Sequence, residues 1–103
     1  MNTSEFARYI VTNMHRATLA NALNISKSID KPGLHSFEEL LVEMQIYIKE
    51  CLQNQKIDSN KCYEILSTIS NSLRNYKATF NYNKIYIIDD FLINLWHILD
   101  RSI

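Results

Sequence analysis

The chain contains one glycine and one proline among its 103 residues, and the two stand next to each other. Folds rich in β-strands need many tight turns, and glycine and proline supply most of those turns. Both lie in "DKPGLHS", residues 30–36, which separates two helical patterns. The sequence therefore predicts an all-α protein: a single domain, residues 1–103, folded as an antiparallel bundle of about four helices with short connections.

The first helical pattern runs from about residue 4 to residue 29, with Thr3 or Ser4 as its candidate N-cap. Its second half contains "NALNISKS", whose asparagine and serine side chains compete with helical hydrogen bonds. The first helix is therefore expected to be either continuous or split at this stretch. The positions expected to face the core are Phe6, Ile10, Met14, Ala17, Ala20 or Asn21, and Ile25.

The second and third helices are the most regular parts of the pattern. Ser36 followed by Glu39 has the spacing of a capping box, and the helix that starts there is expected to reach about Gln53. The segment "NQKIDSN" forms the turn, and Asp58 or Ser59 can cap the third helix. The expected core positions are Phe37, Leu40, Leu41, Met44, Tyr47 or Ile48, and Cys51 in the second helix, and Cys62, Ile65, Leu66, Ile69, Leu73, Tyr76 and Phe80 in the third.

The fourth helix is expected to run from about Lys84 or Asp89 to Arg101, with Asn83 as the candidate cap. Its opening, "IYII", is rich in β-branched residues and is also compatible with one extended turn. Between residues 85 and 99, eleven of fifteen residues are large and apolar. On a helix, one face carries Ile85, Ile88, Leu92, Leu95 and Leu99, whereas Ile87, Phe91, Ile98 and Trp96 lie off that face.

So many apolar residues exceed what a surface helix needs. A helix that is apolar around most of its circumference must be buried on most of it, or it leaves an exposed patch. Each large apolar side chain left in water forgoes roughly 1.5–3 kcal/mol. Either the last helix is the central one, wrapped by the other three, or its surplus contacts another chain, which is a foreign protein or a second copy. In the second case Tyr82, Tyr86 and Trp96 are the expected anchors, because aromatic residues are enriched at interfaces.

Charge and hydropathy argue against several classes of protein. Eleven basic residues balance eleven acidic ones, whereas binding to nucleic acid or anionic membranes draws on an excess of Lys and Arg. No apolar run approaches the roughly 20 residues that cross a bilayer, and "MNTSEFARYIVTN" lacks the cationic start and apolar run of a secretory signal. We expect a cytoplasmic protein without membrane contacts, in which Cys51 and Cys62 are buried and reduced. The balanced charge favours a protein partner over nucleic acid, although a local basic surface is compatible with it.

The sequence contains no arrangement of residues typical of catalysis. His15, His35 and His97 are widely separated. His15 and His97 fall on expected helices but have no candidate ligand four residues later, and His35 falls in the loop before the second helix. The adjacent carboxylates at 38–39 and at 89–90 point in two directions, and a single glycine cannot build a phosphate-binding loop. We therefore expect no enzyme activity, no metal site and no cofactor, unless a site is assembled from scattered residues.

Two charge patterns bear on partners. Glu39, Glu43 and Glu50 form an acidic stripe on the second helix, which is either a solvated surface or a docking surface for a basic partner such as a nuclease. The other pattern is basic residues interleaved with aromatic ones near the end of the third helix, an arrangement that can bind single-stranded nucleic acid. It comprises Arg74, Lys77 and Lys84 with Tyr76, Phe80 and Tyr82, of which the core face already claims Tyr76 and Phe80.

The profile of a short, neutral, all-helical chain is shared by many small bacterial immunity proteins and antitoxins, and equally by phage inhibitors. Fourteen isoleucines and eleven asparagines, with few glycines and prolines, indicate an AT-rich gene from a bacterium, phage or mobile element. We expect a non-catalytic inhibitor that occludes a partner protein, for example a toxin nuclease. The alternative is a nucleic-acid-associated regulator or a small subunit of a nucleoprotein complex. The expected partner-binding residues are Glu39, Glu43, Glu50, Tyr82, Tyr86, Asp89, Asp90 and Trp96.

Overall fold

Five α-helices and one short 3-10 turn make up the computed structural model, which describes residues 2–14, 19–30, 35–78 and 84–100. Within these ranges there is no strand, and the only β-type pairing is an isolated bridge between Ile29 and His35. The prediction of an all-α fold is confirmed. The elements are α1 (Thr3–Met14), α2 (Leu19–Ile25), η1 (Ser26–Ser28), α3 (Phe37–Gln53), α4 (Ser59–Ala78) and α5 (Lys84–Asp100).

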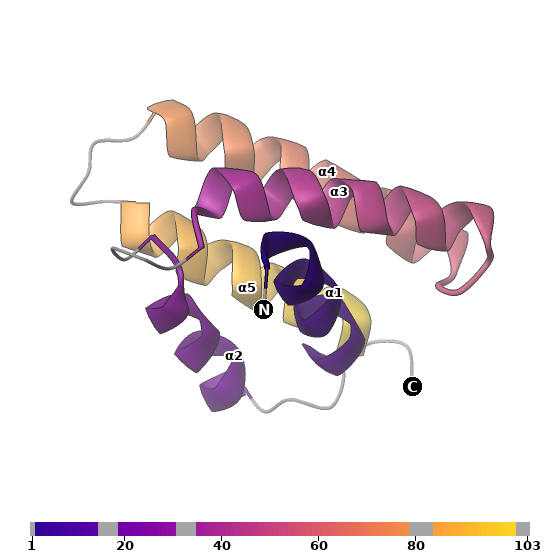
Figure 1. The fold of residues 1–103 in the computed structure, drawn as a ribbon, viewed down its shortest axis with the longest axis horizontal. Coiled ribbons are helices and arrows are strands. Elements are labelled where there is room, and N and C mark those ends of the chain that lie inside the picture. Colours follow the sequence, from indigo (N-terminus) through magenta and orange to yellow (C-terminus); the bar gives the residue numbers. More distant parts are fainter. Residues whose placement is uncertain (1, 15–18, 31–34, 79–83, 101–103) are drawn as a thin grey trace.

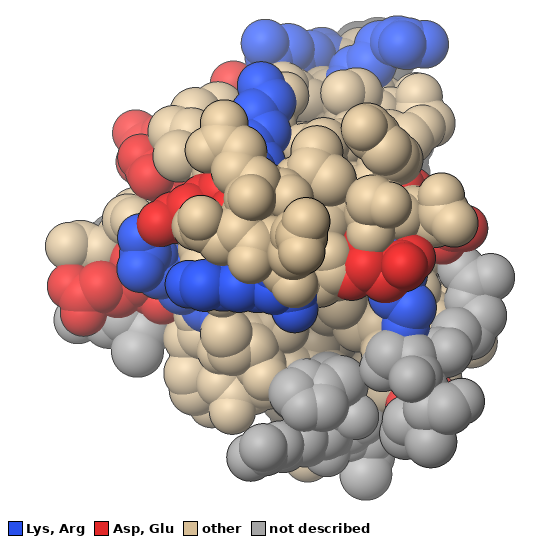
Figure 2. Space-filling model, turned by 90° about the vertical axis from the view of Figure 1, so that its right-hand side faces the viewer, with Lys and Arg blue, Asp and Glu red and all other residues tan. Residues whose placement is uncertain are grey.

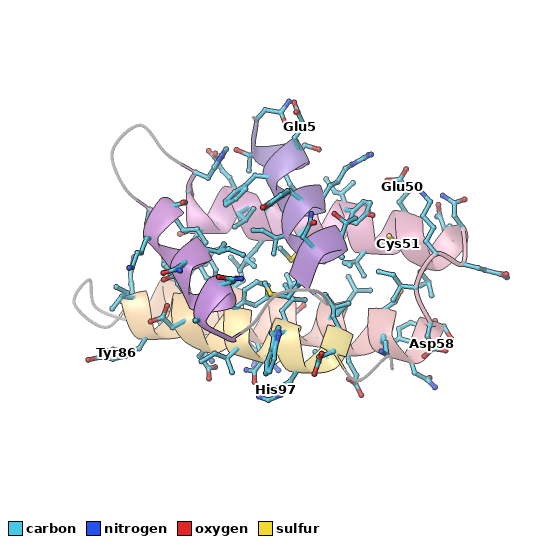
Figure 3. The ribbon with its side chains drawn as sticks, turned by 90° about the horizontal axis from the view of Figure 1, so that it is seen from below. Glu5, Glu50, Cys51, Asp58, Tyr86 and His97 are labelled. Atoms are coloured by element: carbon cyan, nitrogen blue, oxygen red, sulfur yellow. The ribbon has the colours of Figure 1, made fainter. Side chains whose placement is uncertain are left out.

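Three long helices set the architecture. In Figure 1, α3, α4 and α5 lie along the long axis of the molecule and run in alternating directions. α3 packs against α4, α4 packs against α5, and α1 packs on both α3 and α5. Figure 3 shows α1 crossing the long helices rather than running beside them. α5 packs against α1, α2 and α4, so most of its apolar surface lies against helices of the same chain.

The starts of α3 and α4 are fixed by the caps that the sequence predicts. The Ser36 hydroxyl accepts a hydrogen bond from the backbone N–H of Glu39 at 3.4 Å, so α3 begins at the next residue, as the capping-box spacing indicates. Asp58 accepts from the backbone N–H groups of Asn60 and Lys61 at 3.1 and 3.4 Å. Each bond satisfies a helix N-terminal N–H that has no partner within the helix. Asn83 lies outside the described residues.

The first helical pattern is split into α1, α2 and η1, which settles the alternative left open by "NALNISKS". The predicted cap is wrong: Asn2, not Thr3 or Ser4, accepts from the backbone N–H of Glu5 at 2.8 Å, because the helix already begins at Thr3. Ala20 and Asn21 are exposed, contrary to expectation, because α2 is a separate helix and does not continue the buried face of α1. Ala17 lies outside the described residues.

The core is continuous from α1 through α3 and α4 to α5. At its centre Phe37 is fully buried, with its ring centroid 5.0 Å from that of Tyr76 and 5.7 Å from that of Phe91. On α4, Leu66 and Leu73 are only partly buried, and Phe80 lies outside the described residues. The remaining expected positions of α3 and α4 are confirmed as buried: Leu40, Leu41, Met44, Ile48, Cys51, Cys62, Ile65 and Ile69.

The buried face of α5 differs from the expected one. α5 is helical from Lys84, so the alternative of an extended first turn is wrong. Phe91 and Ile98 are buried although they were expected off the core face, because α5 has neighbours on two sides and buries a wider stripe. Ile85 was expected in the core but is 57% exposed, because it lies in the first turn and borders an open hollow there.

Asp30 links the segment before α3 to α4. One of its carboxylate oxygens accepts from the backbone N–H of Phe37 at 2.7 Å, and the other accepts from the hydroxyl of Tyr76. Its backbone has φ of 60°, a left-handed conformation that aspartate tolerates better than most residues. The Asp30 carboxylate therefore connects the end of the segment before the Pro–Gly pair to the first residue of α3 and to a core residue of α4.

This link makes the stability of the fold sensitive to alkaline pH. Burial, and then the hydrogen bond to Asp30, raise the pKa of Tyr76 above its ordinary value of 10.0. The folded state holds the proton of the Tyr76 hydroxyl more tightly than the unfolded state does. The contribution of this group to the free energy of unfolding is therefore complete below about pH 10 and is lost as the pH rises above that value. We expect the free energy of unfolding, measured in urea, to fall above pH 10. In Tyr76→Phe the fall should be shallower by up to about 1.4 kcal/mol per pH unit, and identical slopes would contradict this account.

Candidate protein-binding surface

A groove runs between α4 and α5, and we call it the α4–α5 groove. It consists of two hollows that open to solvent, and each hollow is lined by residues of both helices. The two helices are antiparallel, as Figure 1 shows, so the end of α4 lies beside the start of α5. The hollow lined by later residues of α4 and earlier residues of α5 is therefore followed along the groove by the hollow lined by earlier residues of α4 and later residues of α5. The lining residues are Ser72, Asn75, Tyr86, Ile87, Asp89, Asp90 and Ile93 in the first hollow, and Glu64, Ser67, Thr68, Asn94, His97 and Ile98 in the second.

The α4 side of the groove is lined mainly by short polar side chains. Thr68, Ser72 and Asn75 follow one another at spacings of four and three residues, which places them along one side of the helix, and Ser67 is adjacent to Thr68. The Thr68 hydroxyl turns back to its own helix and donates to the carbonyl of Glu64 at 2.8 Å. Side chains this small do not fill the space between two helix backbones, so the groove stays open. Ser72, which is 7% exposed, lies deepest in this wall.

The α5 side carries the exposed apolar surface that its sequence predicts, confined to the first turn. Tyr86, which lines the groove, is 70% exposed, and in Figure 3 it points away from the ribbon. Ile85 is 57% exposed but borders the separate hollow beside η1. Farther along the helix, Ile87 and Trp96 are partly buried and pack against the core. Most of the apolar surplus of α5 is therefore covered within the chain, and the uncovered part is centred on Tyr86.

The charges of the groove are all negative. Glu64, Asp89 and Asp90 are the ionisable residues that line it besides His97, and no Lys or Arg is present among the described residues of its walls. The adjacent aspartates differ in environment, as their spacing on a helix predicts. Asp90 is exposed and accepts from the side chain of Asn94 at 3.3 Å.

Asp89 is partly buried, and its oxygen Oδ1 is shielded from solvent without a hydrogen-bond partner in the described part of the chain. A buried acceptor without a partner costs about 1–3 kcal/mol, and more when it is charged. The other atom of this kind in the described ranges is Nζ of Lys61, which lines neither hollow. The groove therefore holds a carboxylate whose interactions the isolated chain leaves incomplete.

The acidic stripe on α3 is partly neutralised. Glu50 pairs with Arg8 of α1 at 3.3 Å, and the Arg8 guanidinium also lies 5.3 Å from the centre of the Tyr47 ring. Glu39 is exposed and Glu43 partly exposed, so two of the three predicted residues keep an open acidic surface. No residue of α3 lines the α4–α5 groove among those described, so the structure does not bring the two predicted sets together.

Two exposed apolar residues on α3 were missed by the sequence analysis. Val42 is 47% exposed and Ile46 57% exposed. They lie four residues apart among the glutamates, off the core face of the helix, and that spacing was the available signal. The outer face of α3 is thus a second, smaller candidate surface in which apolar and acidic residues alternate.

In the basic cluster near the end of α4, the ring of Tyr76 is buried and is not available to stack on a nucleic-acid base. Tyr76 is 7% exposed, and the Lys84 ammonium lies 4.4 Å from the centre of its ring. Arg74 and Lys77 are exposed, whereas Phe80 and Tyr82 lie outside the described residues. Figure 2 shows the opposite end of the molecule, where α3 joins α4, and there acidic and basic side chains lie next to one another.

Each of the two histidines in the described ranges lies beside an aromatic ring of the same chain. The His35 ring stacks on Phe6 with a centroid separation of 4.5 Å, and its Nδ1 lies 3.2 Å from the hydroxyl of Thr3. His97 is exposed, with its ring 4.9 Å from that of Trp96, and His15 lies outside the described residues. In the described ranges, no group of three or more His, Cys, Asp or Glu side chains is placed to hold a metal ion.

Cys51 and Cys62 are fully buried near the turn that joins α3 to α4, which confirms the prediction that both are buried, and they form no disulfide with each other. Burial raises the pKa of the Cys62 thiol, and the neighbouring Cys51 raises it further. The reactive form of cysteine is the thiolate, so this environment disfavours thiol chemistry.

None of the described helices is both long enough and apolar enough to cross a bilayer. Comparisons with protein-family models, with curated proteins and with solved structures find no match to this chain. The surfaces described above therefore have to be interpreted from their own geometry and charge.

Proposed function

We propose that this chain is a non-catalytic protein-binding protein that inhibits a partner by covering a basic surface, in the manner of an immunity protein or antitoxin acting on a toxin such as a nuclease. The observation that carries the proposal is the exposed side chain of Tyr86, which stands at the edge of an acidic groove. Large aromatic side chains at the centre of an interface contribute much of its binding energy.

The chemistry of this surface supports occlusion. Tyr86 offers apolar area whose removal from water by another protein stabilises the complex. Asp89 and Asp90 lie one turn farther along the same side of the groove and match lysine and arginine side chains. Enzymes that act on nucleic acids concentrate such cations in their substrate sites, so an acidic protein seated there blocks the substrate. We propose a cytoplasmic site of action, where cysteines such as Cys51 stay reduced.

Site-specific photocrosslinking in the source cells tests this proposal. A photoreactive phenylalanine analogue replaces Tyr86 in one variant and Tyr63 in a control variant. Tyr63 is 60% exposed on α4 and lines neither hollow, so it matches Tyr86 in type and exposure. We expect one protein to crosslink at position 86 and not at position 63, and its activity to fall to zero at an equimolar ratio of the purified chain.

Three results would contradict the proposal. The first is the same set of products from both positions, which would indicate random collision. The second is a specific product whose activity the chain does not inhibit. The third is a crosslink at position 86 to a second copy of this chain, which would assign the surface to self-association.

A further inference from the structure

We propose that the α4–α5 groove receives a helix of the partner that carries an arginine or lysine, and that this cation lies beside Asp89. The inference rests on the proposed function and specifies what the partner presents. It follows from three properties of the groove: its shape, its charge and the incomplete interactions of Asp89.

The shape of the groove favours a helix over an extended segment. Both walls are helices, and the described ranges contain no strand edge to which an extended peptide could add. Tyr86 is the one aromatic residue of its described walls, whereas grooves for proline-rich segments are lined by several. The α4 wall extends from Glu64 to Asn75, about 16 Å at 1.5 Å per residue, or roughly three helical turns. An amphipathic helix of this length places anchors at positions i, i+4 and i+7 along such a groove.

The charge of the groove selects a basic helix. Its described walls contain three carboxylates and no Lys or Arg. An acidic or neutral helix would bury Asp89 and Asp90 without bringing a counter-charge, which is costly for each ion that is fully buried. A helix with a cation on the side that faces the groove compensates that cost, and apolar neighbours on the same side would contact Ile87 and Ile93.

Asp89 is the residue at which this cation is expected. Its Oδ1 is shielded from solvent and unpartnered, whereas the carboxylate of the adjacent Asp90 is exposed and bonded to Asn94. The free chain therefore carries a carboxylate with one unsatisfied oxygen, and a partner's cation that approaches Asp89 from the groove offsets this cost through the charge that the two oxygens share. Two consequences follow for an Asp89→Asn variant: weaker binding of a basic helix and higher stability of the chain alone.

Titration with defined peptides tests the binding consequence. The probe is an alanine-rich helical peptide of 18 residues with leucines at i, i+4 and i+7 and one arginine on the same side. A matched peptide has citrulline, which keeps the shape but not the charge, in place of arginine. In ¹H–¹⁵N spectra of the full chain, we expect the arginine peptide to shift the signals of Ser72, Asp89 and Ile93 and to bind at least about tenfold more tightly than the citrulline peptide, a difference of 1.4 kcal/mol.

The Asp89→Asn variant should bind both peptides equally, while Asp100→Asn, which removes a carboxylate from the same helix outside the groove, should keep the preference for arginine. Equal binding of the two peptides to the unmodified chain, no binding of either, or shifts centred on Val42 and Ile46 would overturn the inference. So would an Asp89→Asn variant that keeps the preference.

Thermal unfolding of the chain alone gives an independent readout. We expect Asp89→Asn to raise the melting temperature by about 4 °C or more, the shift that 1 kcal/mol produces in a domain of this size. Asp90→Asn should give no such rise, because the Asp90 carboxylate is exposed and has a partner. A melting temperature that is unchanged or lower in Asp89→Asn would contradict the role given to this carboxylate.

Failure of this inference and failure of the proposed function are distinguishable. If a protein crosslinks at position 86 and is inhibited, but Asp89→Asn binds it as well as the unmodified chain does, then the inhibitor function stands and the basic helix is wrong. If the arginine peptide occupies the groove but no crosslinked protein is inhibited, then the groove binds basic helices and the inhibitor function is wrong.

Discussion

Replacing Phe37 by alanine is expected to lower the free energy of unfolding by about 3–5 kcal/mol, the usual loss for a fully buried phenylalanine. Phe37 is the first residue of α3, and its ring contacts Tyr76 of α4 and Phe91 of α5. The substitution therefore removes the side chain at which three helices meet. Against a typical total of about 5–15 kcal/mol, the loss is enough to leave part of the variant unfolded at 37 °C.

Urea unfolding followed by circular dichroism measures this effect, with two controls. Phe37→Leu keeps an apolar side chain at the same place and should lose clearly less than the alanine variant. Tyr63→Ala removes an aromatic side chain that is 60% exposed and should change the stability by no more than about 0.5 kcal/mol. A loss below about 1 kcal/mol in Phe37→Ala would show that the three helices do not depend on this contact.

Replacing Tyr86 by serine is expected to weaken binding of the crosslinked partner by at least about thirtyfold, which corresponds to about 2 kcal/mol, the lower bound for a side chain that dominates an interface. The same change should leave the stability of the chain within about 0.5 kcal/mol, because Tyr86 is 70% exposed. Loss of binding without loss of stability distinguishes an interface residue from a core residue.

Isothermal titration calorimetry with the purified partner measures the change in affinity, and Tyr63→Ser is the matched control. The two tyrosines are both mostly exposed and lie on adjacent helices, but only Tyr86 lines the groove. Equal affinities of the Tyr86→Ser and Tyr63→Ser variants would mean that the exposed surface on α5 does not take part in binding.

The helices could be predicted because their signals are local. Ser36 and Glu39 are three residues apart, and Asp58 precedes the helix that it caps, so the sequence alone contains both starts. The buried face of α5 was predicted less well, because burial depends on which helices lie beside it. Phe91 is buried and Ile85 is exposed because of where α1, α2 and α4 pack on α5. The spacing of apolar residues within α5 does not contain that information.

The candidate site could be predicted only in part. Tyr86, Asp89 and Asp90 were singled out from the sequence, and all three line the groove. The α4 wall was missed, because Ser72 and Asn75 are indistinguishable in sequence from ordinary solvated positions. The pairing of Glu50 with Arg8 was also missed, because the two residues are 42 positions apart and meet only when α1 packs on α3. Tyr82 lies outside the described residues.

The outer face of α3 is the competing surface for a partner. It combines the exposed residues Val42 and Ile46 with Glu39 and Glu43. Its apolar residues are smaller than Tyr86, and aliphatic residues of this size contribute less often than aromatic ones to the energy of interfaces. We therefore place the partner on the α4–α5 groove, and the two surfaces are far enough apart in sequence for one experiment to separate them.

Hydrogen–deuterium exchange of the chain, with and without the partner identified by crosslinking, shows most directly whether the partner binds at the α4–α5 groove or at the outer face of α3. Binding at the groove predicts slower exchange of backbone amides in residues 84–93 of α5 and 67–75 of α4, with no change in residues 39–46 of α3. Slower exchange confined to residues 39–46, or no difference between the free and bound chain in α4 and α5, would contradict the claim that this groove is where the protein works.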